Sequence, residues 1–586
     1  MENILRQIDD YLQKIVGNRE LSGQIRKEIE EFGPRGEGIH VYYRSLARDP
    51  AAPDVFYLAA DLPGPSLLVS RPGRAEVRPF AATDRQAIRH FAETIDRSFL
   101  PRPQKEGPAV AAGNRHPEIS LPAAFDAFGR ILESRGVNVA STVQLSATRE
   151  MTTAARLARR SGENPTEMGH TGVAIEHLYH AGLWAAIRAG WRAGYTAEAD
   201  HFIISGASER EIAASIELTR EAIRAAAGFT KFTTDTSRLF VLEADGRHPR
   251  AWSDPQVERE FGRLLSPEDQ RWAWEEFSRP FSIGEKTYRF AREEIRRLAV
   301  KFSQSLRLNE TLYDYIAQVK RESGRAGDFD FEPSIDEAET LTTAGELIFY
   351  MHWLAARGRP AQLVPPNLGF KKRQAYPETA DALARYAADH MWPELVPRVE
   401  AEHSGRPLDE LRARVEELAA VARCFGGTLS IHSGSGKQAS VLESIGRATA
   451  GRVNYKISGE LQLQLLDVLS EQPAGSRWRA LYERMVDRCC QFAQVQAFGK
   501  ESALASLYQA RGLAYSLGDR QKGRTDGNLF LVFWLGNIVG SRDIADPSGD
   551  CRFFKQKLDE LPERIVEEAR GRNSEYIVWL ARQLLG

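Results

Sequence analysis

The sequence has few cysteines: four occur among 586 residues, and no two of them form a Cys-x-x-Cys pair. This absence argues against a zinc ribbon, which needs such pairs, and low cysteine usage is typical of proteins in a reducing cytoplasm. The chain also has almost no excess charge, with a formal net charge of −2 at pH 7. Nothing in that balance favours a nucleic acid or an anionic membrane as a partner.

Long apolar runs are absent as well. The longest, LFLVFWLG, begins at Leu529 and is far shorter than the roughly 20 residues of a membrane-spanning helix. The amino-terminal segment is not typical of a signal peptide, because Glu2, Asp9 and Asp10 interrupt its apolar residues. With 42% apolar and 27% charged residues, the composition is that of a soluble globular protein. We therefore expect a soluble, cytoplasmic protein without a membrane partner.

A complete phosphate-binding loop is missing too. In the string IHSGSGK at 431–437, Gly436 and Lys437 fit the end of that motif. Ile431 stands where its first glycine is required, and Gln438 stands where a hydroxyl should meet magnesium. No convincing GxGxxG fingerprint of a dinucleotide-binding fold is present either. The glycines at 434 and 436 must therefore serve another kind of loop.

The chain is too long for one ordinary domain, and its pattern changes twice. Short β-like runs separated by Pro/Gly turns occupy residues 38–80, which predicts a small antiparallel sheet beside an amino-terminal helix. From about residue 476 the pattern is helical. We expect an amino-terminal helix and sheet over 1–105, a catalytic domain over 106–475 and a helical region over 476–586.

Eight strand-like runs alternate with amphipathic helical stretches in the central domain. Strand–helix alternation predicts a parallel α/β sheet, and eight repeats predict a closed (β/α)8 barrel, the TIM barrel; an open doubly wound sheet is the alternative. The gap at about 237–328 exceeds a normal connection and should hold a helical insertion. The eight runs are 108–115, 138–145, 196–203, 229–236, 329–336, 362–369, 427–434 and 452–459.

Polar residues gather at the ends of these runs, where the active site of such a barrel lies. Side chains alternate along a strand. Ser430 and His432 therefore share one face of the seventh run, and Glu332 and Asp336 share one face of the fifth. Because helices cover the outside, these polar faces must point into the barrel. Charged groups there are costly unless they are paired or bound to a metal.

Carboxylates and imidazoles converge in this way on one mouth of the barrel, which suits a divalent cation: zinc, manganese or cobalt. In the alternative, Asp200 and His201 form an ordinary hydrogen-bonded pair and the carboxylates bridge Lys231 and Lys456. The converging residues are Asp200, His201, Glu332, Asp336, Glu337 and His432.

Five strings at these strand ends occur in the same order as in a known family. They are LSATREM from 145, TAEADH from 196, EPSIDEAETLTTAGE from 332, IHSGSGK from 431 and YKISG from 455. In this respect the chain resembles the tagaturonate epimerases, metal-dependent (β/α)8 enzymes that act on ketouronates and, in some members, on fructose and tagatose. The resemblance runs over roughly residues 108–460.

The resemblance implies roles for the strand-end residues. The metal ligands would be Asp200, His201, Glu337 and His432. The candidate catalytic carboxylates are Asp336, Glu332 and Glu150, and the assignment of ligand and base among the strand-five acids stays open. The candidate substrate-binding residues are Arg115, Gln144, Arg149, Lys231, Asp235, Lys372, Ser433, Ser435, Lys437 and Lys456.

The chain departs from the family pattern at three places. Asn114 and Gly436 stand where the family has aspartates, and Pro366 stands where an arginine is usual. These differences leave the exact substrate open and motivate an alternative, a sugar-binding homologue that has lost catalysis. A metal-dependent sugar isomerase or aldolase on the same barrel is a further alternative.

The activity expected from the resemblance is the inversion of a hydroxyl-bearing carbon in a ketouronate, such as tagaturonate or fructuronate, or in a ketose such as tagatose. Because a proton β to a ketone is not acidic, we expect retro-aldol cleavage and recombination rather than enolisation. Transient oxidation would need a tightly held nicotinamide, for which the sequence offers no motif. The expected partner is a small sugar or sugar acid, and an oligomer is compatible with the sequence.

Overall fold

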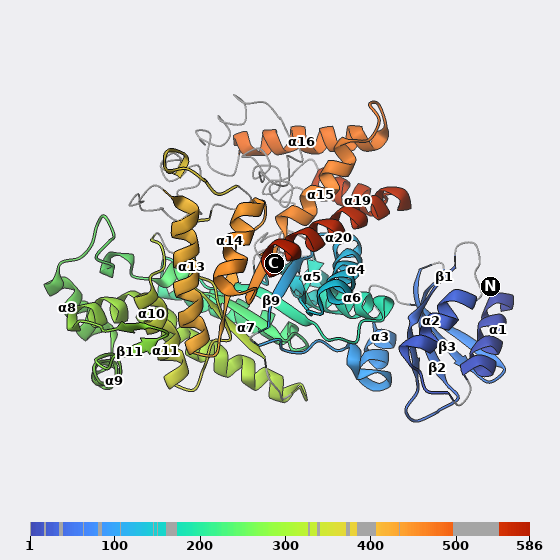
Figure 1. Cartoon of the computed structure of the whole chain (residues 1–586), viewed down its shortest axis with the longest axis horizontal. Coiled ribbons are helices and arrows are strands. Elements are labelled where there is room, and N and C mark those ends of the chain that lie inside the picture. Colours follow the sequence, from blue (N-terminus) through green and yellow to red (C-terminus); the bar gives the residue numbers. More distant parts are fainter. Residues whose placement is uncertain are drawn as a thin grey trace.

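The computed structural model of the chain (Figure 1) describes most of its 586 residues. The described ranges are 2–16, 19–33, 39–62, 64–79, 85–105, 107–144, 146–148, 151–159, 173–325, 329–336, 340–370, 375–383, 406–432, 434–495 and 550–586.

The centre of the molecule is an eight-stranded parallel sheet with the strand order β13-β10-β9-β6-β5-β16-β15-β14. Each strand lies within one of the eight predicted runs, and the first strand pairs with the last, as in a barrel. The strands are β5 (Ala109–Gly113), β6 (Ala140–Gln144), β9 (Thr196–Ile203), β10 (Lys231–Asp235), β13 (Asp330–Ser334), β14 (Leu363–Val364), β15 (Thr428–Ile431) and β16 (Val453–Ile457).

The two ends of this sheet, β13 and β14, also meet. The backbone N–H of Gln362 donates to the carbonyl of Phe331 at 3.0 Å, and the N–H of Ile335 donates to the carbonyl of Pro365 at 3.3 Å. These bonds join fifth and sixth strands without a regular ladder, so the barrel is nearly closed. The prediction of a (β/α)8 barrel is therefore confirmed, and the open sheet is excluded.

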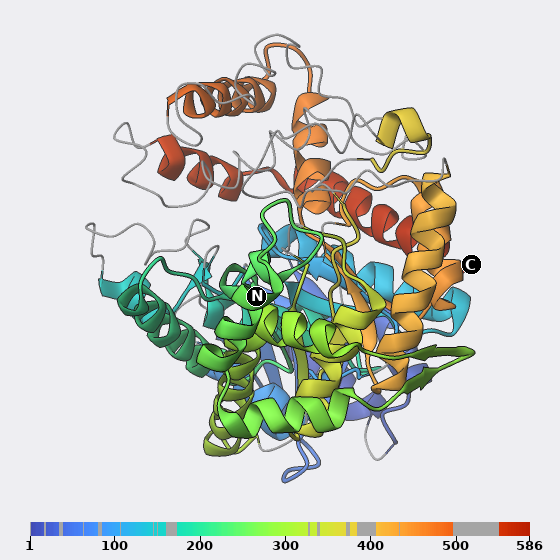
Figure 2. The same ribbon diagram turned by 90° about the vertical axis from the view of Figure 1, so that its left-hand side faces the viewer.

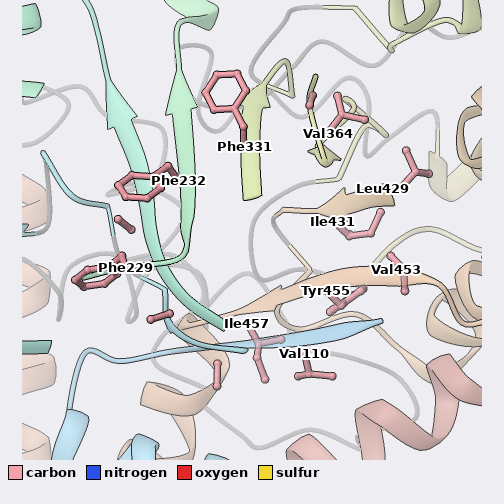
Figure 3. Close-up of a cluster of buried hydrophobic side chains, with 14 of the residues drawn as sticks. Val110, Phe229, Phe232, Phe331, Val364, Leu429, Ile431, Val453, Tyr455 and Ile457 are labelled. Carbon is pink, nitrogen blue, oxygen red and sulfur yellow. The ribbon is translucent and has the colours of Figure 1, made fainter. Parts of the chain in front are cut away.

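Helices follow the strands and cover the outside of the barrel. The outward side chains of the strands, such as Val110, Phe232, Phe331 and Tyr455, are buried among apolar residues of these helices (Figure 3). The inward side chains of the same strands are mostly polar. The covering helices are α4 (Pro117–Arg135), α6 (Ile175–Ala189), α7 (Glu209–Ala225), α10 (Arg292–Glu322), α11 (Ala344–Ala356), α13 (Pro407–Cys424), α14 (Ala439–Thr449) and α15 (Gly459–Ser470). Between β6 and α6 lie the short α5 (Ala154–Arg159) and the pair β7 (Met151–Thr152) and β8 (Val173–Ala174).

The amino-terminal part is a four-stranded antiparallel sheet in the order β1-β2-β3-β4. One face of this sheet packs under the first two helices in a small core of its own that contains Leu58 and Leu68. The other face, with Tyr57 and Leu67, joins the large core of the barrel helices. The sheet is therefore a layer between the first two helices and the helices of the barrel (Figure 1). Its elements are α1 (Glu2–Tyr11), α2 (Gly23–Phe32), β1 (His40–Arg48), β2 (Phe56–Asp61), β3 (Pro65–Arg71) and β4 (Arg74–Pro79), followed by α3 (Gln86–His90).

The segment between β10 and β13 contains two further helices and a hairpin before the barrel helix α10. They are α8 (Asp254–Leu264), α9 (Pro267–Phe277) and the strands β11 (Phe281–Ile283) and β12 (Lys286–Tyr288). Helices α8 and α9 pack against α10 on the outside of the barrel, and Figure 2 shows this green part of the chain in front of the barrel.

The carboxyl-terminal part contains α16 (Arg477–Val495), α19 (Asp550–Asp559) and α20 (Glu563–Leu585). Helix α20 packs against α4, α14 and α15, the helices beside the first, seventh and eighth strands (Figure 1). Part of the predicted helical region, residues 496–549, lies outside the described residues. None of the helices within the described ranges is long and apolar enough to cross a membrane.

The packing of α20 on α14 predicts the effect of a single methyl group. A Cβ added at Gly446 of α14 would lie 2.5 Å from the backbone oxygen of Leu584, whereas a Cβ added at Gly129 of α4 would meet nothing within 4 Å. We expect Gly446→Ala to lower the free energy of unfolding by about 1–3 kcal/mol through overpacking. Gly129→Ala should raise it by about 0.5–1 kcal/mol, because alanine favours a helix. Urea unfolding followed by circular dichroism measures both, and equal midpoints for the two variants would contradict the packing.

Candidate active site

The interior of the barrel is polar rather than apolar. In many TIM barrels, branched aliphatic side chains fill this space. Here, buried charged and hydroxyl side chains from four strands line it. These residues are Glu198 and Asp200 on β9, Lys231, Thr233 and Asp235 on β10, Asp330, Glu332 and Ser334 on β13, and Lys456 on β16.

Lys456 is the hub of this interior. Its ammonium lies 2.6 Å from Oδ1 of Asp200 and 2.6 Å from Oε1 of Glu332, and it also contacts Glu198. It donates to Oγ1 of Thr233 at 3.2 Å. Burial alone would lower the pKa of Lys456, but the three carboxylates hold that pKa well above its ordinary value. The ammonium is therefore a fixed positive charge in the middle of the barrel.

Lys231 forms a second bridge between the same acids. Its ammonium lies 2.9 Å from Oε2 of Glu198 and 3.5 Å from Oε2 of Glu332. The hydroxyl of Thr233 donates to Oε1 of Glu198 at 3.0 Å and lies 3.2 Å from Oε1 of Glu332. The carboxylates thus bridge Lys231 and Lys456, which is the alternative considered from the sequence.

A bulge in β9 brings two consecutive side chains to the mouth. Across from β9, Phe232 pairs with Ala199 and Thr234 pairs with Phe202, so Asp200 and His201 together oppose one residue. His201 has a φ of +48°, in the left-handed region that is strained for most residues other than glycine. A bulge of this kind re-aims a side chain. It explains why both members of the pair reach the site although neighbours on a regular strand point to opposite faces.

The loop after β6 holds the bulge in place. The N–H of Ala147 donates to the carbonyl of Asp200 at 2.6 Å, and the hydroxyl of Thr148 accepts a hydrogen bond from the N–H of Ile203 at 2.9 Å. Hydroxyls of Ser146 and Thr148 lie 3.3 and 3.4 Å from the carbonyl oxygen of His201. A strained backbone persists where the surroundings fix it in this way, most often at functional sites.

His432 faces His201 across the mouth, with ring centroids 4.8 Å apart. Its Nε2 lies 2.7 Å from Oε1 of Glu332, within hydrogen-bonding distance. Its Nδ1 lies 3.2 Å from Oδ2 of Asp336, yet this nitrogen makes no well-aligned hydrogen bond within the described part of the chain. The hydroxyl of Ser334 donates to the other oxygen of Asp336.

Burial and the neighbouring carboxylates act on the pKa of each histidine in opposite directions. Burial and Lys456 lower the pKa of His432, but Asp336 and Glu332 prevail and raise it to about 9. Burial likewise lowers the pKa of His201, and Asp200, whose Oδ1 lies 2.8 Å from Nδ1 of His201, raises it above its ordinary value. Burial raises the pKa of Asp200, yet His201 and Lys456 hold it well below the usual range.

Among the described residues, four carboxylates, on Glu198, Asp200, Glu332 and Asp336, face two ammonium groups. Two further positive charges balance this cluster, supplied either by protonation of both histidines, whose pKa values are raised, or by one divalent cation beside neutral histidines. Two groups of side chains, His201 with Asp336 and His432, and Asp200 with Glu332 and His432, bring ligand atoms within 4.8 Å of one another. The ammonium of Lys456 already lies between Asp200 and Glu332, so the first group fits a divalent cation better.

Other predicted site residues lie around this mouth. Arg115 follows β5, and its Nε lies 3.3 Å from Oγ of Ser458 after β16. The N–H of Ser458 also donates to Oγ of Ser435 at 3.3 Å. Lys437 is buried, and its ammonium lies 5.1 Å from the ring centroid of Phe370. The substrate-binding roles of these residues stay predictions.

Lys231, Lys456 and Asp235 lie in the interior, and their predicted contacts with substrate likewise stay predictions. Asp235 is buried, and its Oδ1 accepts from the N–H of Ser237 at 3.1 Å. Outside the described residues lie Glu150, Arg149, Glu337, Lys372, Ser433 and the side chain of Gln144.

All three departures from the family pattern lie among the described residues, and Pro366 is buried after β14. Asn114 is buried; its amide donates to the carbonyl of Ala112 at 2.9 Å and its oxygen accepts from Ser120 at 2.7 Å. An aspartate could not make the first of these bonds, so the asparagine suits this local contact. Gly436 has a φ of +80°, which favours glycine.

Glu198 is a member of the cluster that the sequence analysis did not include among the site residues. It is fully buried and contacts both Lys231 and Lys456. Alternation along the strand could have found it, because Glu198 lies two residues before Asp200 and shares its face. Thr233 follows from the same argument on β10.

Residues 136–372, which include β6 to β14, match the family model described as tagaturonate epimerase. Over these residues the chain is similar to the tagaturonate epimerases. The match confirms the resemblance expected from the strand-end strings.

A curated tagaturonate/fructuronate epimerase of Thermotoga maritima is 24% identical to this chain over 312 residues, which is 52% of this chain and 52% of that protein. The chain thus matches about half the length of this relative. Two crystal structures of the fructuronate-tagaturonate epimerase UxaE of Cohnella laeviribosi share the fold. The form with two glycerols has a TM-score of 0.64 and 19% identity and covers 96% of this chain and 99% of its own. The native form has a TM-score of 0.62 and 17% identity and covers 96% of this chain and 100% of its own.

The contacts of Lys456 predict a large loss of stability on its removal. Lys456→Met would leave three buried carboxylates without their common countercharge, which should cost about 3–5 kcal/mol of the free energy of unfolding. Lys231→Met is the matched control, because Lys231 contacts only two of these acids among the described residues, one of them at 3.5 Å.

Urea unfolding with a chelator present measures both variants. The loss should be larger for Lys456→Met and should be partly reversed by adding Glu332→Gln, which removes one negative charge. Equal stability of Lys456→Met and the wild-type protein would contradict the interior network.

Proposed function

We propose that this protein is a metal-dependent epimerase that inverts the hydroxyl-bearing carbon β to the ketone of a ketouronate such as fructuronate or tagaturonate. The observation that carries the proposal is the convergence of His201, Asp336 and His432, whose ligand atoms lie within 4.8 Å of one another at the mouth of the barrel. The full-length likeness of the fold to a fructuronate-tagaturonate epimerase supports it.

The contacts of each histidine indicate which nitrogen is available for a metal. Nδ1 of His201 lies 2.8 Å from Asp200, and Nε2 of His432 lies 2.7 Å from Glu332. A ligating histidine commonly donates its other N–H to a carboxylate, which fixes the tautomer and the ring. This leaves Nε2 of His201, Nδ1 of His432 and the carboxylate of Asp336 as the ligand atoms, with Glu337 as the further ligand that the sequence implies. Asp200 and Glu332 then orient the histidines rather than bind the metal.

The proposed route of the inversion is carbon–carbon cleavage, because the proton on a carbon β to a ketone is not acidic and transient oxidation would need a nicotinamide, for which the sequence offers no motif. A carboxylate removes the proton of the hydroxyl group, the bond between the α and β carbons breaks, and an aldehyde and an enediolate form. The aldehyde rotates and the enediolate attacks its other face, so the same bond forms again. The proton then returns to the inverted alkoxide, and no oxidant is consumed.

The residues of the mouth divide this work. A divalent cation, when bound, polarises the ketone and stabilises the negative charge of the enediolate. Of the carboxylates that the resemblance implies as catalytic, Glu150 is the proposed base, because Glu332 contacts His432 and Lys456 and Asp336 is assigned to the metal. Arg115 and Lys437 supply positive charge for the carboxylate of the substrate.

Product analysis tests the proposed reaction. Purified wild-type protein, with zinc, manganese or cobalt added in turn, is incubated with fructuronate, tagaturonate, fructose and tagatose, and the products are identified by NMR. We expect interconversion of the two ketouronates and loss of activity with a chelator. Isomerisation to an aldose, or release of two three-carbon products, would instead support a sugar isomerase or an aldolase.

Amide substitutions should separate the carboxylates by role. We expect Asp336→Asn and Glu337→Gln to lose bound metal and activity together. Glu332→Gln should weaken metal binding by about 10–100-fold, the usual effect of removing a group that orients a ligand. Glu150→Gln should keep its metal and lose about 10²–10⁴-fold in turnover, as expected for a general base. Elemental analysis and turnover are measured on the same preparations, and full metal content in Asp336→Asn would reverse the ligand assignment.

A further inference from the structure

The loop after β13 carries Asp336, and a buried ionic cluster outside the barrel holds that loop. The carboxylate of Asp245 accepts hydrogen bonds from Lys301 of α10 at 2.7 Å and from the hydroxyl of Thr340 at 3.1 Å. Glu346 of α11 contacts the same lysine. Burial raises the pKa of Asp245, but Arg247 and Lys301 hold it well below its usual range.

Arg247 connects this cluster to the loop. Its guanidinium binds Asp245 in a fork, with Nε 3.0 Å from Oδ1 and Nη2 2.7 Å from Oδ2. Nη1 donates to the backbone oxygen of Leu341 at 2.9 Å, and Nη2 lies 3.2 Å from the hydroxyl of Thr340. Nη2 also lies 2.8 Å from Oε1 of Glu346. One side chain thus joins two carboxylates and two consecutive residues of the loop.

Further contacts fasten the loop on both sides of Asp336. Before it, the N–H of Ile335 donates to the carbonyl of Pro365 at 3.3 Å. After it, the amide of Asn367 donates to the carbonyl of Thr340 at 2.9 Å, and the N–H of Thr342 donates to the carbonyl of Asn367 at 3.0 Å. Four positions, 336–339, lie between the two anchored residues Ile335 and Thr340. Because the length of a chain limits the distance between its ends, the position of Thr340 bounds the position of Asp336.

We infer that Arg247 is a positioning residue that sets the carboxylate of Asp336 against the two histidines through Thr340 and Leu341. The inference rests on the proposed metal site. It assigns a role to the segment between β10 and α10. The described ion-pair partners of His201 and His432 are Asp200, Glu332 and Asp336, and none of them lies in that segment. Charge alone would not suffice, because the contacts use the fork of the guanidinium, which lysine lacks.

A matched control exists in the same protein. Arg359 binds Asp314 in the same fork, with distances of 3.0 and 2.7 Å, and its Nη1 donates to the backbone oxygen of Arg357 at 2.6 Å. It follows α11, away from the loop. Arg247→Lys and Arg359→Lys each remove a guanidinium fork to an aspartate and a bond to a backbone oxygen, and both keep the charge. Arg247 makes further contacts with Thr340 and Glu346, and its aspartate is buried whereas Asp314 is exposed. Only the first substitution touches the segment that carries Asp336.

The test measures the dissociation constants of zinc and of manganese, together with urea midpoints, for the wild type and both variants. We expect Arg247→Lys to weaken metal binding by about 10–100-fold and Arg359→Lys to leave it within about twofold, since it lies outside the path to the site. Thr340→Val should weaken it in the same direction. Its effect should not add to that of Arg247→Lys, because both remove one shared contact.

The outcomes separate this inference from the proposed function. Equal losses of stability in both arginine variants with unchanged metal affinity would overturn the positioning role, and so would a wild type that binds neither metal. A wild type that binds metal but does not interconvert ketouronates would overturn the epimerase activity and leave the positioning role standing if Arg247→Lys still weakens metal binding.

Discussion

The contact of the Lys456 ammonium with three carboxylates is the interaction on which the rest of the site depends. A charge in a barrel interior loses its hydration, and only a close partner of opposite sign offsets that loss. Lys456 supplies this partner for Glu198, Asp200 and Glu332 at once. Two of these acids in turn contact the histidines of the mouth. The positions of both imidazoles therefore follow from one lysine on the eighth strand, and the stability of the barrel and the geometry of the site are not separable.

The bulge of β9 shows how the backbone adapts to this arrangement. A regular strand would place Asp200 inside and His201 outside. The extra residue and the left-handed conformation of His201 cost free energy locally, and the hydrogen bonds of the β6 loop together with the Asp200 contact to Lys456 offset that cost. The histidine gains a carboxylate neighbour in its own strand, so its orientation needs no separate support from another part of the barrel.

Much of this could be predicted from the sequence, and the limits have physical reasons. Strand–helix alternation located all eight strands, and the period of two along β13 correctly turned Glu332 inward. Alternation cannot reveal a bulge, so it gave no reason for His201 to join Asp200 at the mouth. Alternation also does not predict which charged side chains meet across a barrel. The sequence therefore left two interpretations open, carboxylates that bridge Lys231 and Lys456 and carboxylates that bind a metal. The contacts of Arg247 could not be predicted for the same reason. They join Arg247 to Thr340 and Leu341, about ninety positions later in the chain, and sequence periodicity carries no information on such side-chain contacts.

The two interpretations are compatible. Deep in the barrel the lysines bridge the acids, as an ordinary ionic network would, and at the mouth the ligand atoms of His201, His432 and Asp336 lie close together. Two acids of the ionic network also contact the histidines, so under the proposed function the same contacts would orient the ligands of the cation. Asn114 and Gly436, which stand where the resemblance expects aspartates, are not among the residues that contact Lys231 or Lys456 in the described network. Asn114 bonds to Ala112 and Ser120, and Gly436 has a φ that favours glycine. Both positions are therefore explained by local contacts that leave the charges of the interior unchanged.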